Sequence, residues 1–464
     1  MYVEKILGSL QSVHQAGTLA RYCVSLSPPK TVKILGVESN PSFYYVIREA
    51  KFHAMEKFDT LIIGGGPAGL IAAIRAASLG QNVAIAEKNH SVGEKLLLSG
   101  KGRCNFTNAE PDIDVFISKY GENGKFLYSA FSKFGPIETM KFFRHIGVEG
   151  VEERGKRIFP TDGGAQRVLN ALIMQCKKYN VKIMRNTTVK ALKVRNSRVD
   201  CVITNNDEFQ ADKYILATGG KSHPKTGSTG DGYRFAEQAG HTITKLYPAL
   251  VPVRTRETWV KLASGCELKN VRLTVILNGK EIDNRFGEME FTNFGVSGPI
   301  VMDISSHIPD WQGDLELSLD LKPTLTDEIL TGRVKREIEK FSGRKRFQGL
   351  VRSLVPAGLV HLILELSDIP HDKPIEYISE EEILEFVKLL KDIRMNVNGL
   401  WSFNNAVVTR GGVSLAEIDP ATMKSKLCDN LYLAGEILDL NGPSGGFNLQ
   451  VCWSTGYIAG SVNE

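Results

Sequence analysis

A glycine-rich loop near residue 65 limits the fold of this chain more than any other segment. Residues 58–63 form a short β-prone run, followed by Gly64-x-Gly66-x-x-Gly69 and an alanine-rich helical stretch at 70–80. The first glycine permits a tight turn, the second lets backbone approach a pyrophosphate, and the third lets helix and strand touch. The positive end of the helix dipole then points at the phosphates. This order predicts a dinucleotide-binding βαβ unit, with Pro67 and Ala68 in the same loop.

An acidic residue stands where such a unit needs one. A second β-prone run at 82–86 is followed by Glu87, eighteen residues after Gly69. A carboxylate at this point accepts hydrogen bonds from ribose hydroxyls and disfavours a 2′-phosphate. The alternative is a glycine turn in an unrelated α/β unit, which the flanking strand, helix and acid make much less plausible. The loop alone does not separate FAD from NAD.

Two later segments predict further strand ends beside the cofactor. The strand "YILATGG" at 214–220 follows strand-like pieces at 187–194, 198–204 and 208–211, and it offers Thr218 and Gly219 either as contacts or as a plain turn. The segment 430–460 contains a strand, Gly435-Glu436, Gly445-Gly446 and a helix from about Phe447 to Ala459. We expect a second helix start there with unoccupied backbone N–H groups.

Three stretches together carry a family resemblance. "GEKLLLSGKGRCNFTN" at 93–108, "EMEFTNFGVSGP" at 288–299 and the segment 430–460 closely resemble the bacterial flavoproteins of the aminoacetone-oxidase-like or BaiN-like group, which are NAD(P)/FAD-dependent oxidoreductases. The resemblance covers residue 55 to the C-terminus. It implies an α/β fold of the two-dinucleotide-binding-domain, glutathione-reductase-like FAD Rossmann type, with inserted small β-barrel and helical domains. It specifies substrate poorly, because the group includes members associated with bile-acid reduction and with amine oxidation.

The resemblance also implies a set of cofactor-binding residues. The ADP half of FAD would be bound by Gly64, Gly66, Gly69, Glu87 and Lys88, with the backbone of Val189 at the adenine. Along the pyrophosphate and flavin it places Lys95, Gly102, Arg103, Cys104 and Asn105, and around the riboflavin half Gly435, Glu436, Gly446, Phe447 and Asn448. A loop rich in Gly, Lys, Arg, Ser and Asn independently offers cations and backbone donors to a diphosphate. Ordinary surface charge is the alternative for Lys95 and Arg103.

Two residues invite a catalytic interpretation that we do not adopt. Cys104 has no second cysteine within a few residues, as disulfide reductases require, so a packed thiol is the favoured interpretation. Asn293 stands where the family commonly carries histidine, and an amide does not titrate at neutral pH. No catalytic acid or base is assigned. The seven cysteines are scattered without a C-x-x-C pair, so we expect no metal site.

The chain between the cofactor segments predicts inserted domains. Alternating or apolar β runs fill most of 246–322, and the period becomes helical from 324, with Thr326 and Ser379 as candidate N-caps. We expect residues 55–245 and 410–464 to form the FAD domain, 246–323 with 394–409 a small barrel-like domain or a sandwich, and 324–393 a helical insert. Clefts form at domain junctions, so substrate should meet the flavin between barrel and FAD domain.

Residues 1–54 match none of these motifs. They are basic and contain "LSPPK", which interrupts a helix. A transit peptide is one interpretation. The favoured one is that Met55 is the natural start and that the upstream residues are read-through from an early start codon. We therefore expect 1–54 to lie outside the fold.

Composition excludes few function classes. The net charge of +5 is too dilute to imply a polyanionic partner, and no run reaches the eighteen apolar residues of a membrane span. The scattered, odd-numbered cysteines fit a reducing cytoplasm, so we expect a soluble, cytoplasmic protein. The eight basic residues at 333–352 favour a solvated helix face over nucleic-acid binding, because 365–392 is rich in acids. The oligomeric state is left open.

Together these observations predict an FAD-dependent oxidoreductase that transfers a hydride between flavin and a small organic substrate, with NAD(P)H as electron donor. No second G-x-G-x-x-G is present, so NAD(P)H would bind transiently over the flavin. The alternatives are an amine oxidase that uses O2 and, in a different class, a tRNA-binding or tRNA-modifying flavoprotein.

Overall fold

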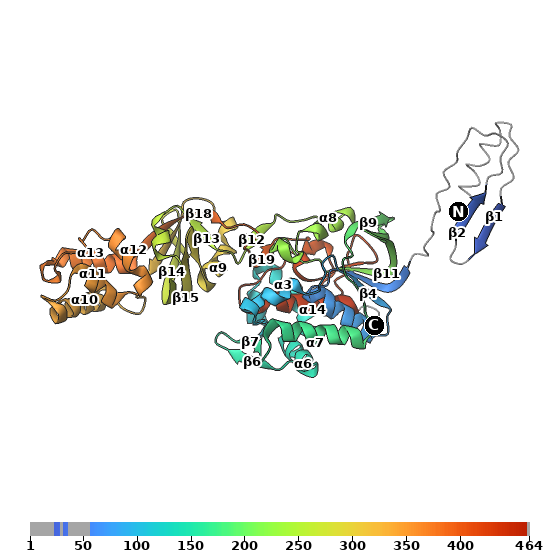
Figure 1. Cartoon of the computed structure of the whole chain (residues 1–464), viewed down its shortest axis with the longest axis horizontal. Coiled ribbons are helices and arrows are strands. Elements are labelled where there is room, and N and C mark those ends of the chain that lie inside the picture. Colours follow the sequence, from blue (N-terminus) through green and yellow to red (C-terminus); the bar gives the residue numbers. More distant parts are fainter. Residues whose placement is uncertain (1–22, 28–30, 36–55, 462–464) are drawn as a thin grey trace, which may run out of the picture. The chain divides into compact units, whose positions relative to one another are not determined.

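The computed structural model describes residues 23–27, 31–35 and 56–461 (Figure 1). The chain divides into two units, residues 1–56 and 57–464. In the first unit β1 (Cys23–Ser27) pairs antiparallel with β2 (Thr31–Leu35). The other residues of the N-terminal extension lie outside the described chain. The second unit is undivided, so the domain limits expected within it stay predictions.

A seven-stranded mixed sheet forms the centre of the second unit. Its strands follow the order β8-β4-β3-β11-β10-β9, and β20 also pairs with β11. The bounds are β3 (Glu56–Ile63), β4 (Val83–Ala86), β8 (Lys182–Met184), β9 (Val189–Arg195), β10 (Arg198–Thr204), β11 (Glu208–Leu216) and β20 (Leu431–Leu433). Pairing is parallel for β3 with β4, β4 with β8, and β11 with β20, and antiparallel along β9, β10 and β11. The long β11 thus joins the predicted meander to the parallel strands.

Two helices that start at the glycine motifs pack directly against each other. They are α2 (Pro67–Ser78) and α14 (Phe447–Ser461). Ala72, Ala73 and Ala76 are fully buried on α2, and α14 presents Gly456 and Gly460. Small residues let the two backbones approach closely. Their packing brings the first turns of α2 against the second half of α14, almost 400 residues apart in the sequence.

Shorter elements surround this pair of helices. The helices are α3 (Glu94–Leu98), α4 (Ile113–Ser118), α5 (Tyr128–Phe134), α6 (Pro136–His145), α7 (Gly164–Lys178) and α8 (Asp231–Gln238). A three-stranded sheet contains β5 (Thr107–Asn108), β7 (Arg157–Pro160) and β6 (Gly150–Glu153). A two-stranded sheet pairs β12 (Tyr247–Ala249) with β19 (Val408–Arg410), where the chain leaves and re-enters this part of the fold.

The inserted β segment closes into a six-stranded barrel, which decides between the barrel and the sandwich that its strand pattern predicts. In order around the barrel the strands are β13 (Val253–Thr255), β16 (Gly295–Ser297), β15 (Lys280–Thr292), β14 (Glu267–Leu277), β17 (Leu315–Asp320) and β18 (Ile393–Leu400). Burial alternates along β17, whose Leu315, Leu317 and Leu319 enter the core. Helix α9 (Pro299–Ser305) follows β16 and packs on β15.

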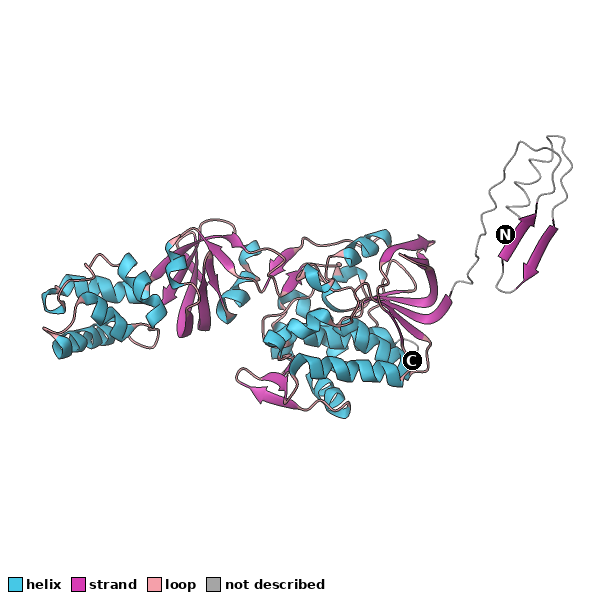
Figure 2. Cartoon of the chain, in the orientation of Figure 1, coloured by secondary structure: helices cyan, strands magenta, loops and turns pink. Residues whose placement is uncertain are grey.

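The helical insert shares its hydrophobic core with the barrel. Its helices are α10 (Asp327–Phe341), α11 (Phe347–Leu354), α12 (Val360–Leu366) and α13 (Glu380–Lys391), and Figure 2 shows the change from strands to helices. Both predicted N-caps are confirmed. The Thr326 side chain accepts from the N–H of Ile329, and Ser379 forms a capping box with Glu382.

Candidate functional site

A cavity of about 1230 Å³ lies at the starts of α2 and α14. Residues at the carboxyl ends of β4, β11 and β20 in the seven-stranded sheet line it, and ligands bind at such strand ends in open α/β sheets. Strands β14 and β15 and helix α9 contribute another part of the wall. The volume exceeds the roughly 300–1,000 Å³ of a single-ligand pocket, so a dinucleotide and a substrate can be held together.

The three glycines of the first motif differ in their surroundings. A Cβ on Gly64, whose φ is +105°, would lie 2.5 Å from the carbonyl oxygen of Ala217, and one on Gly69 would lie 1.9 Å from that of Gly64. A Cβ on Gly66 would meet nothing within 4 Å. Gly64 and Gly69 therefore allow turn and helix to pack, whereas Gly66 leaves backbone open to the cavity. Since Gly66 supplies no side-chain cap, the first N–H groups of α2 are available to an anion.

Glu87 lies at the end of β4 and is buried, with 8% of its surface exposed. Its Oε2 accepts from the N–H of Gly65 and its Oε1 from that of Asn89, both at 2.8 Å. Burial raises the pKa of Glu87 above its ordinary value, against the effect of these two hydrogen bonds. Lys88 forms an ion pair with Asp231 at 2.8 Å. Lys88 and Val189 line the same cavity.

A network of charged and polar side chains joins the segment at 93–108 to the segment at 430–460. Lys95 Nζ donates to Glu436 Oε2 and to Ser222 Oγ, each at 2.6 Å. Glu436 Oε1 accepts from Ser222 Oγ at 2.7 Å and from the N–H of Thr409 at 2.8 Å. Burial alone would raise the pKa of Glu436, but Lys95 and these donors hold it below its ordinary value. Glu436 is therefore an anion at neutral pH, fixed beside the cavity.

Two buried polar atoms in the cavity wall have no partner within the described chain. They are Asn105 Oδ1 and Thr218 Oγ1. A buried polar atom without a hydrogen bond costs about 1–3 kcal/mol, which a ligand can recover. With the open backbone at Gly66 and the two helix starts, this donor and acceptor set fits a dinucleotide such as FAD.

The structure brings most of the sequence-predicted residues to this cavity. The residues that line it are Gly64, Gly66, Pro67, Ala68, Glu87, Lys88, Lys95, Asn105, Val189, Thr218, Gly219, Gly435, Glu436, Gly446, Phe447 and Asn448. Both helix starts therefore face one cavity, as the two glycine motifs predict. Their contacts with a cofactor stay predictions.

Gly69, Gly102, Arg103 and Cys104 are absent from the cavity lining. The Arg103 guanidinium lies 4.2 Å from the centroid of the Phe159 ring and forms an ion pair with Glu153. Cys104 is fully buried, and burial raises the pKa of its thiol to about 12. A thiol with this pKa is protonated at neutral pH, which is the environment of a packed side chain.

Sequence reasoning placed the substrate between barrel and FAD domain but named no site residue on the barrel side of the cavity. Arg285, Glu288 and Glu290 of β15 line it, as does Asp303 of α9. Asp303 Oδ1 accepts from the N–H of Ser444, 141 residues later in the chain. Glu288 and Glu290 belong to the motif at 288–299, but only the barrel register shows that they line the cavity together with Arg285 and Asp303. Asn293, in contrast, is exposed and outside the lining.

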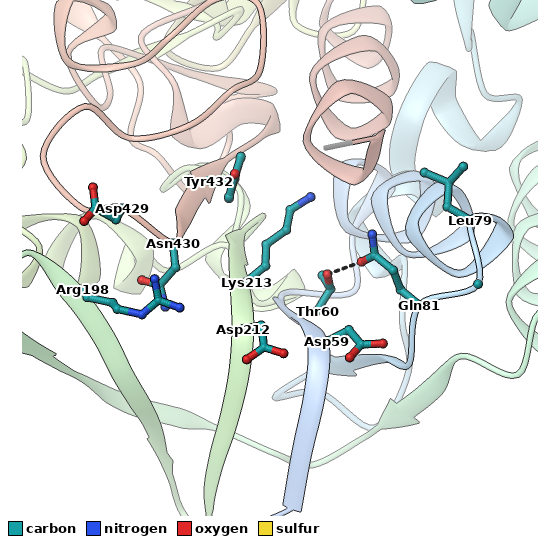
Figure 3. A pocket seen from close by; sticks show the side chains of 11 residues that line it. Asp59, Thr60, Leu79, Gln81, Arg198, Asp212, Lys213, Asp429, Asn430 and Tyr432 are labelled. Carbon is teal, nitrogen blue, oxygen red and sulfur yellow. Dashed lines mark hydrogen bonds between the residues drawn. The ribbon is translucent and has the colours of Figure 1, made fainter. Parts of the chain in front are cut away.

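A smaller pocket of about 320 Å³ lies near the start of β20 (Figure 3). Thr60 Oγ1 donates to Gln81 Oε1 at 2.6 Å, and the Lys213 ammonium lies 4.6 Å from the centroid of the Tyr432 ring. Burial lowers the pKa of Lys213 to about 8. This pocket contains none of the predicted cofactor residues, so it is separate from the candidate site.

Comparison with a protein-family model decides the assignment. The model described as the HI0933-like protein Rossmann domain matches residues 58–462. The chain belongs to the HI0933-like family. The resemblance to BaiN-like flavoproteins is thereby confirmed, and the chain is an FAD-dependent oxidoreductase of that family.

Two relatives match the HI0933-like chain over nearly their whole length. It is 33% identical over 404 residues to the 3-dehydro-bile acid delta(4,6)-reductase of Clostridium scindens, covering 86% of this chain and 97% of that protein. It is 32% identical over 404 residues to the ribosomal RNA dihydrouridine synthase of Haemophilus influenzae, covering 86% and 96%. Among solved structures, a 3-ketosteroid-delta4-(5alpha)-dehydrogenase from Rhodococcus jostii RHA1 has a TM-score of 0.48 and 14% identity, covering 89% of this chain and 98% of that one.

None of the helices in the described part of the chain is long and apolar enough to cross a membrane.

Proposed function

We propose that this HI0933-like chain is an FAD-dependent reductase, supplied with electrons by NAD(P)H, that saturates a carbon–carbon double bond conjugated to a carbonyl group. The proposal rests on the reactions that the names of its two relatives describe. A 3-dehydro-delta(4,6) bile acid has a ring ketone conjugated with double bonds, and dihydrouridine is uridine with its carbonyl-conjugated ring double bond reduced. The two substrates differ in size and class but share this bond, so the bond is the common element.

The cavity residues have distinct tasks in this proposal. The N–H groups at the start of α2 and the open backbone at Gly66 bind the pyrophosphate of FAD, and Glu87 binds the ribose. The start of α14 offers positive potential to the negative charge of a reduced flavin. Bound FAD supplies the hydride chemistry between nicotinamide and substrate. The Lys95–Glu436 pair keeps the loop after β20 in place.

The barrel wall supports a ring-shaped substrate. Phe286, Met289, Ile300 and Met302 give it an apolar lining, which suits a planar conjugated system. In the described chain no cavity-lining residue comes from 304–406, so the basic stretch at 333–352 does not contribute. The insert 324–393 carries eleven basic and thirteen acidic residues, and its charge does not favour RNA. These features support a small conjugated molecule as substrate.

RNA stays the second candidate because the Haemophilus influenzae relative acts on ribosomal RNA. The reduced bond is of the same type in both cases. The candidates differ in whether the ring belongs to a small molecule or to a nucleotide within a folded RNA. An amine oxidase is the third alternative, since it shares the flavin but needs O2.

Anaerobic spectroscopy tests the proposal. NADPH or NADH should bleach the flavin absorbance of the purified protein within seconds, and a 3-oxo-4-ene steroid should restore it without O2. Restoration by ribosomal RNA and not by the steroid would support the second candidate. Peroxide release with an amine, together with no bleaching by either nicotinamide, would rule out the reductase.

A further inference from the structure

We propose that Asp303 is the catalytic acid of this site. The inference rests on the proposed function, because saturation of a conjugated double bond needs a proton as well as a hydride. With FAD bound, NAD(P)H would supply the hydride that forms the new C–H bond at the β-carbon. The π electron pair of the C=C bond then forms a second C–H bond, at the α-carbon, with the proton of the Asp303 carboxyl group. The O–H bond breaks, and the resulting carboxylate regains a proton from solvent.

The position of Asp303 supports this role. It belongs to α9, in the barrel wall of the cavity, and its Oδ1 accepts from the N–H of Ser444 at 2.9 Å. Ser444 lies in the loop that leads to Gly446 and Phe447, which are predicted to hold the riboflavin half of FAD. Pro443, Ser444 and Gly445 line the cavity beside Asp303. The carboxyl group therefore lies where the barrel meets the flavin-side loop.

Other carboxylates of the cavity are already engaged in the described chain. Glu436 pairs with Lys95, Asp231 with Lys88, and Glu110 with Lys156. Both oxygens of Glu87 accept backbone N–H groups. An ion-paired carboxylate stays ionised and is a poor proton donor.

The remaining carboxylates of the cavity are less enclosed or less well placed. Glu267 and Glu288 are exposed, and Glu267 lies opposite the partly buried Glu290 across β14 and β15. Glu94 lies in the first turn of α3, which belongs to neither the barrel strands nor α9. Asp314, exposed just before β17 and outside the cavity lining, provides an Asp→Asn control.

The surroundings of Asp303 raise the pKa of its carboxyl group. Burial raises its pKa above the ordinary value, whereas hydrogen bonds from Ser444 and the charges of Arg285 and His307 act in the opposite direction. Burial also lowers the pKa of His307, with Arg285 and Arg410 acting in the same direction, so this imidazole carries little charge at neutral pH. A donor whose pKa lies closer to neutrality transfers its proton more efficiently.

A purely structural role is the competing explanation. The hydrogen bond from Ser444 joins α9 to the flavin-side loop, and Asp303 could serve only to hold them together. Asp303→Asn separates the two roles. The amide oxygen still accepts from the Ser444 N–H, but the side chain has no acidic proton to donate.

The experiment compares wild-type holoenzyme with Asp303→Asn and Asp314→Asn. We expect all three to keep their flavin spectrum and to be reduced by NADPH at rates within twofold. Reoxidation by a 3-oxo-4-ene steroid, measured anaerobically by stopped flow, should fall at least 100-fold in Asp303→Asn and less than threefold in Asp314→Asn. The wild-type rate should fall as pH rises through the pKa of Asp303, and this dependence should vanish in Asp303→Asn.

A second measurement needs no turnover. Carboxyl ¹³C NMR of aspartate-labelled wild-type protein, with the resonance assigned by its absence in Asp303→Asn, should show Asp303 titrating above 3.8. Titration at or below that value, or reoxidation of Asp303→Asn within threefold of wild type, would overturn the role. If wild type is reduced by NADPH but no conjugated carbonyl compound or RNA reoxidises it, the proposed function fails and the role of Asp303 fails with it.

Discussion

Ala68 of α2 and Gly456 of α14 approach so closely that a Cβ on Gly456 would lie 2.4 Å from the carbonyl oxygen of Ala68. One turn further along, a Cβ on Gly460 would lie 2.5 Å from the carbonyl oxygen of Ala72. This contact fixes two helices that start at the same cavity. The close approach of their backbones therefore determines the spacing between the two helix starts.

Gly456→Ala should destabilise the fold and weaken FAD binding together. The added methyl group pushes α14 away from α2, and overpacking of this kind costs about 1–3 kcal/mol. Gly332→Ala in α10 is the matched control, because a Cβ there would meet only the Arg336 side chain, at 3.4 Å. It should be neutral or stabilising by up to about 1 kcal/mol. Urea unfolding and flavin retention measure both effects, and equal stabilities would contradict the prediction.

Gly66→Ala should leave the flavin-free protein folded but impair cofactor binding. Its Cβ meets no protein atom within 4 Å, so the methyl group occupies only space that the ligand needs. We expect the dissociation constant of FAD to rise at least tenfold, about 1.4 kcal/mol. Gly69→Ala should instead destabilise the flavin-free protein, since its Cβ would lie 1.9 Å from Gly64 O. Calorimetry of both variants without flavin, and fluorescence titration with FAD, distinguish the two effects.

Lys95→Met should leave the Glu436 carboxylate without its cation. Breaking a buried ion pair costs roughly 3–5 kcal/mol, and we expect about 3 because 21% and 14% of the two side chains stay exposed. The surface pair Lys57–Asp212 is the control, and Lys57→Met should cost less than about 1 kcal/mol. Denaturant unfolding at neutral pH measures both values. A loss as small as that of the surface pair would disprove the role of Lys95.

The loss of unfolding free energy caused by Lys95→Met should depend on pH. The pKa of Glu436 is lowered in the folded protein, so the stabilisation from its ionised form is complete above the ordinary value of 4.5 and is lost as pH falls through the folded-state value. The difference in unfolding free energy between wild type and Lys95→Met should therefore narrow in acid. A difference that stays constant from pH 7 to pH 3 would contradict this assignment.

Asn293→Ala should have no effect on catalysis. Asn293 is exposed and absent from the cavity lining, although it occupies the position where the family commonly has histidine. Flavin reduction and reoxidation rates should stay within twofold of wild type, and Asn293→His should behave alike. A tenfold change in either rate would show that this loop reaches the site during turnover.

Local sequence determined the parts of this protein that depend on neighbouring residues. Gly64, Gly66 and Gly69 specify a turn and a helix start because each conformation involves only a few consecutive residues. The Thr326 and Ser379 caps and the alternation along β17 follow from equally short-range rules, and all were visible in the amino-acid order. The family motifs also predicted that the cofactor is FAD.

Only the tertiary structure decided which distant side chains meet. Lys95 and Glu436 are 341 residues apart, and Asp303 and Ser444 are 141 apart. Such pairs depend on the register of the barrel strands and on the packing of α2 against α14. Two distant groups come into contact only after the intervening chain has folded. No short-range sequence pattern therefore predicts these pairs. For the same reason the sequence located the cofactor loops and predicted a cleft beside the barrel, but it did not identify the side chains of the barrel wall where the substrate chemistry is proposed.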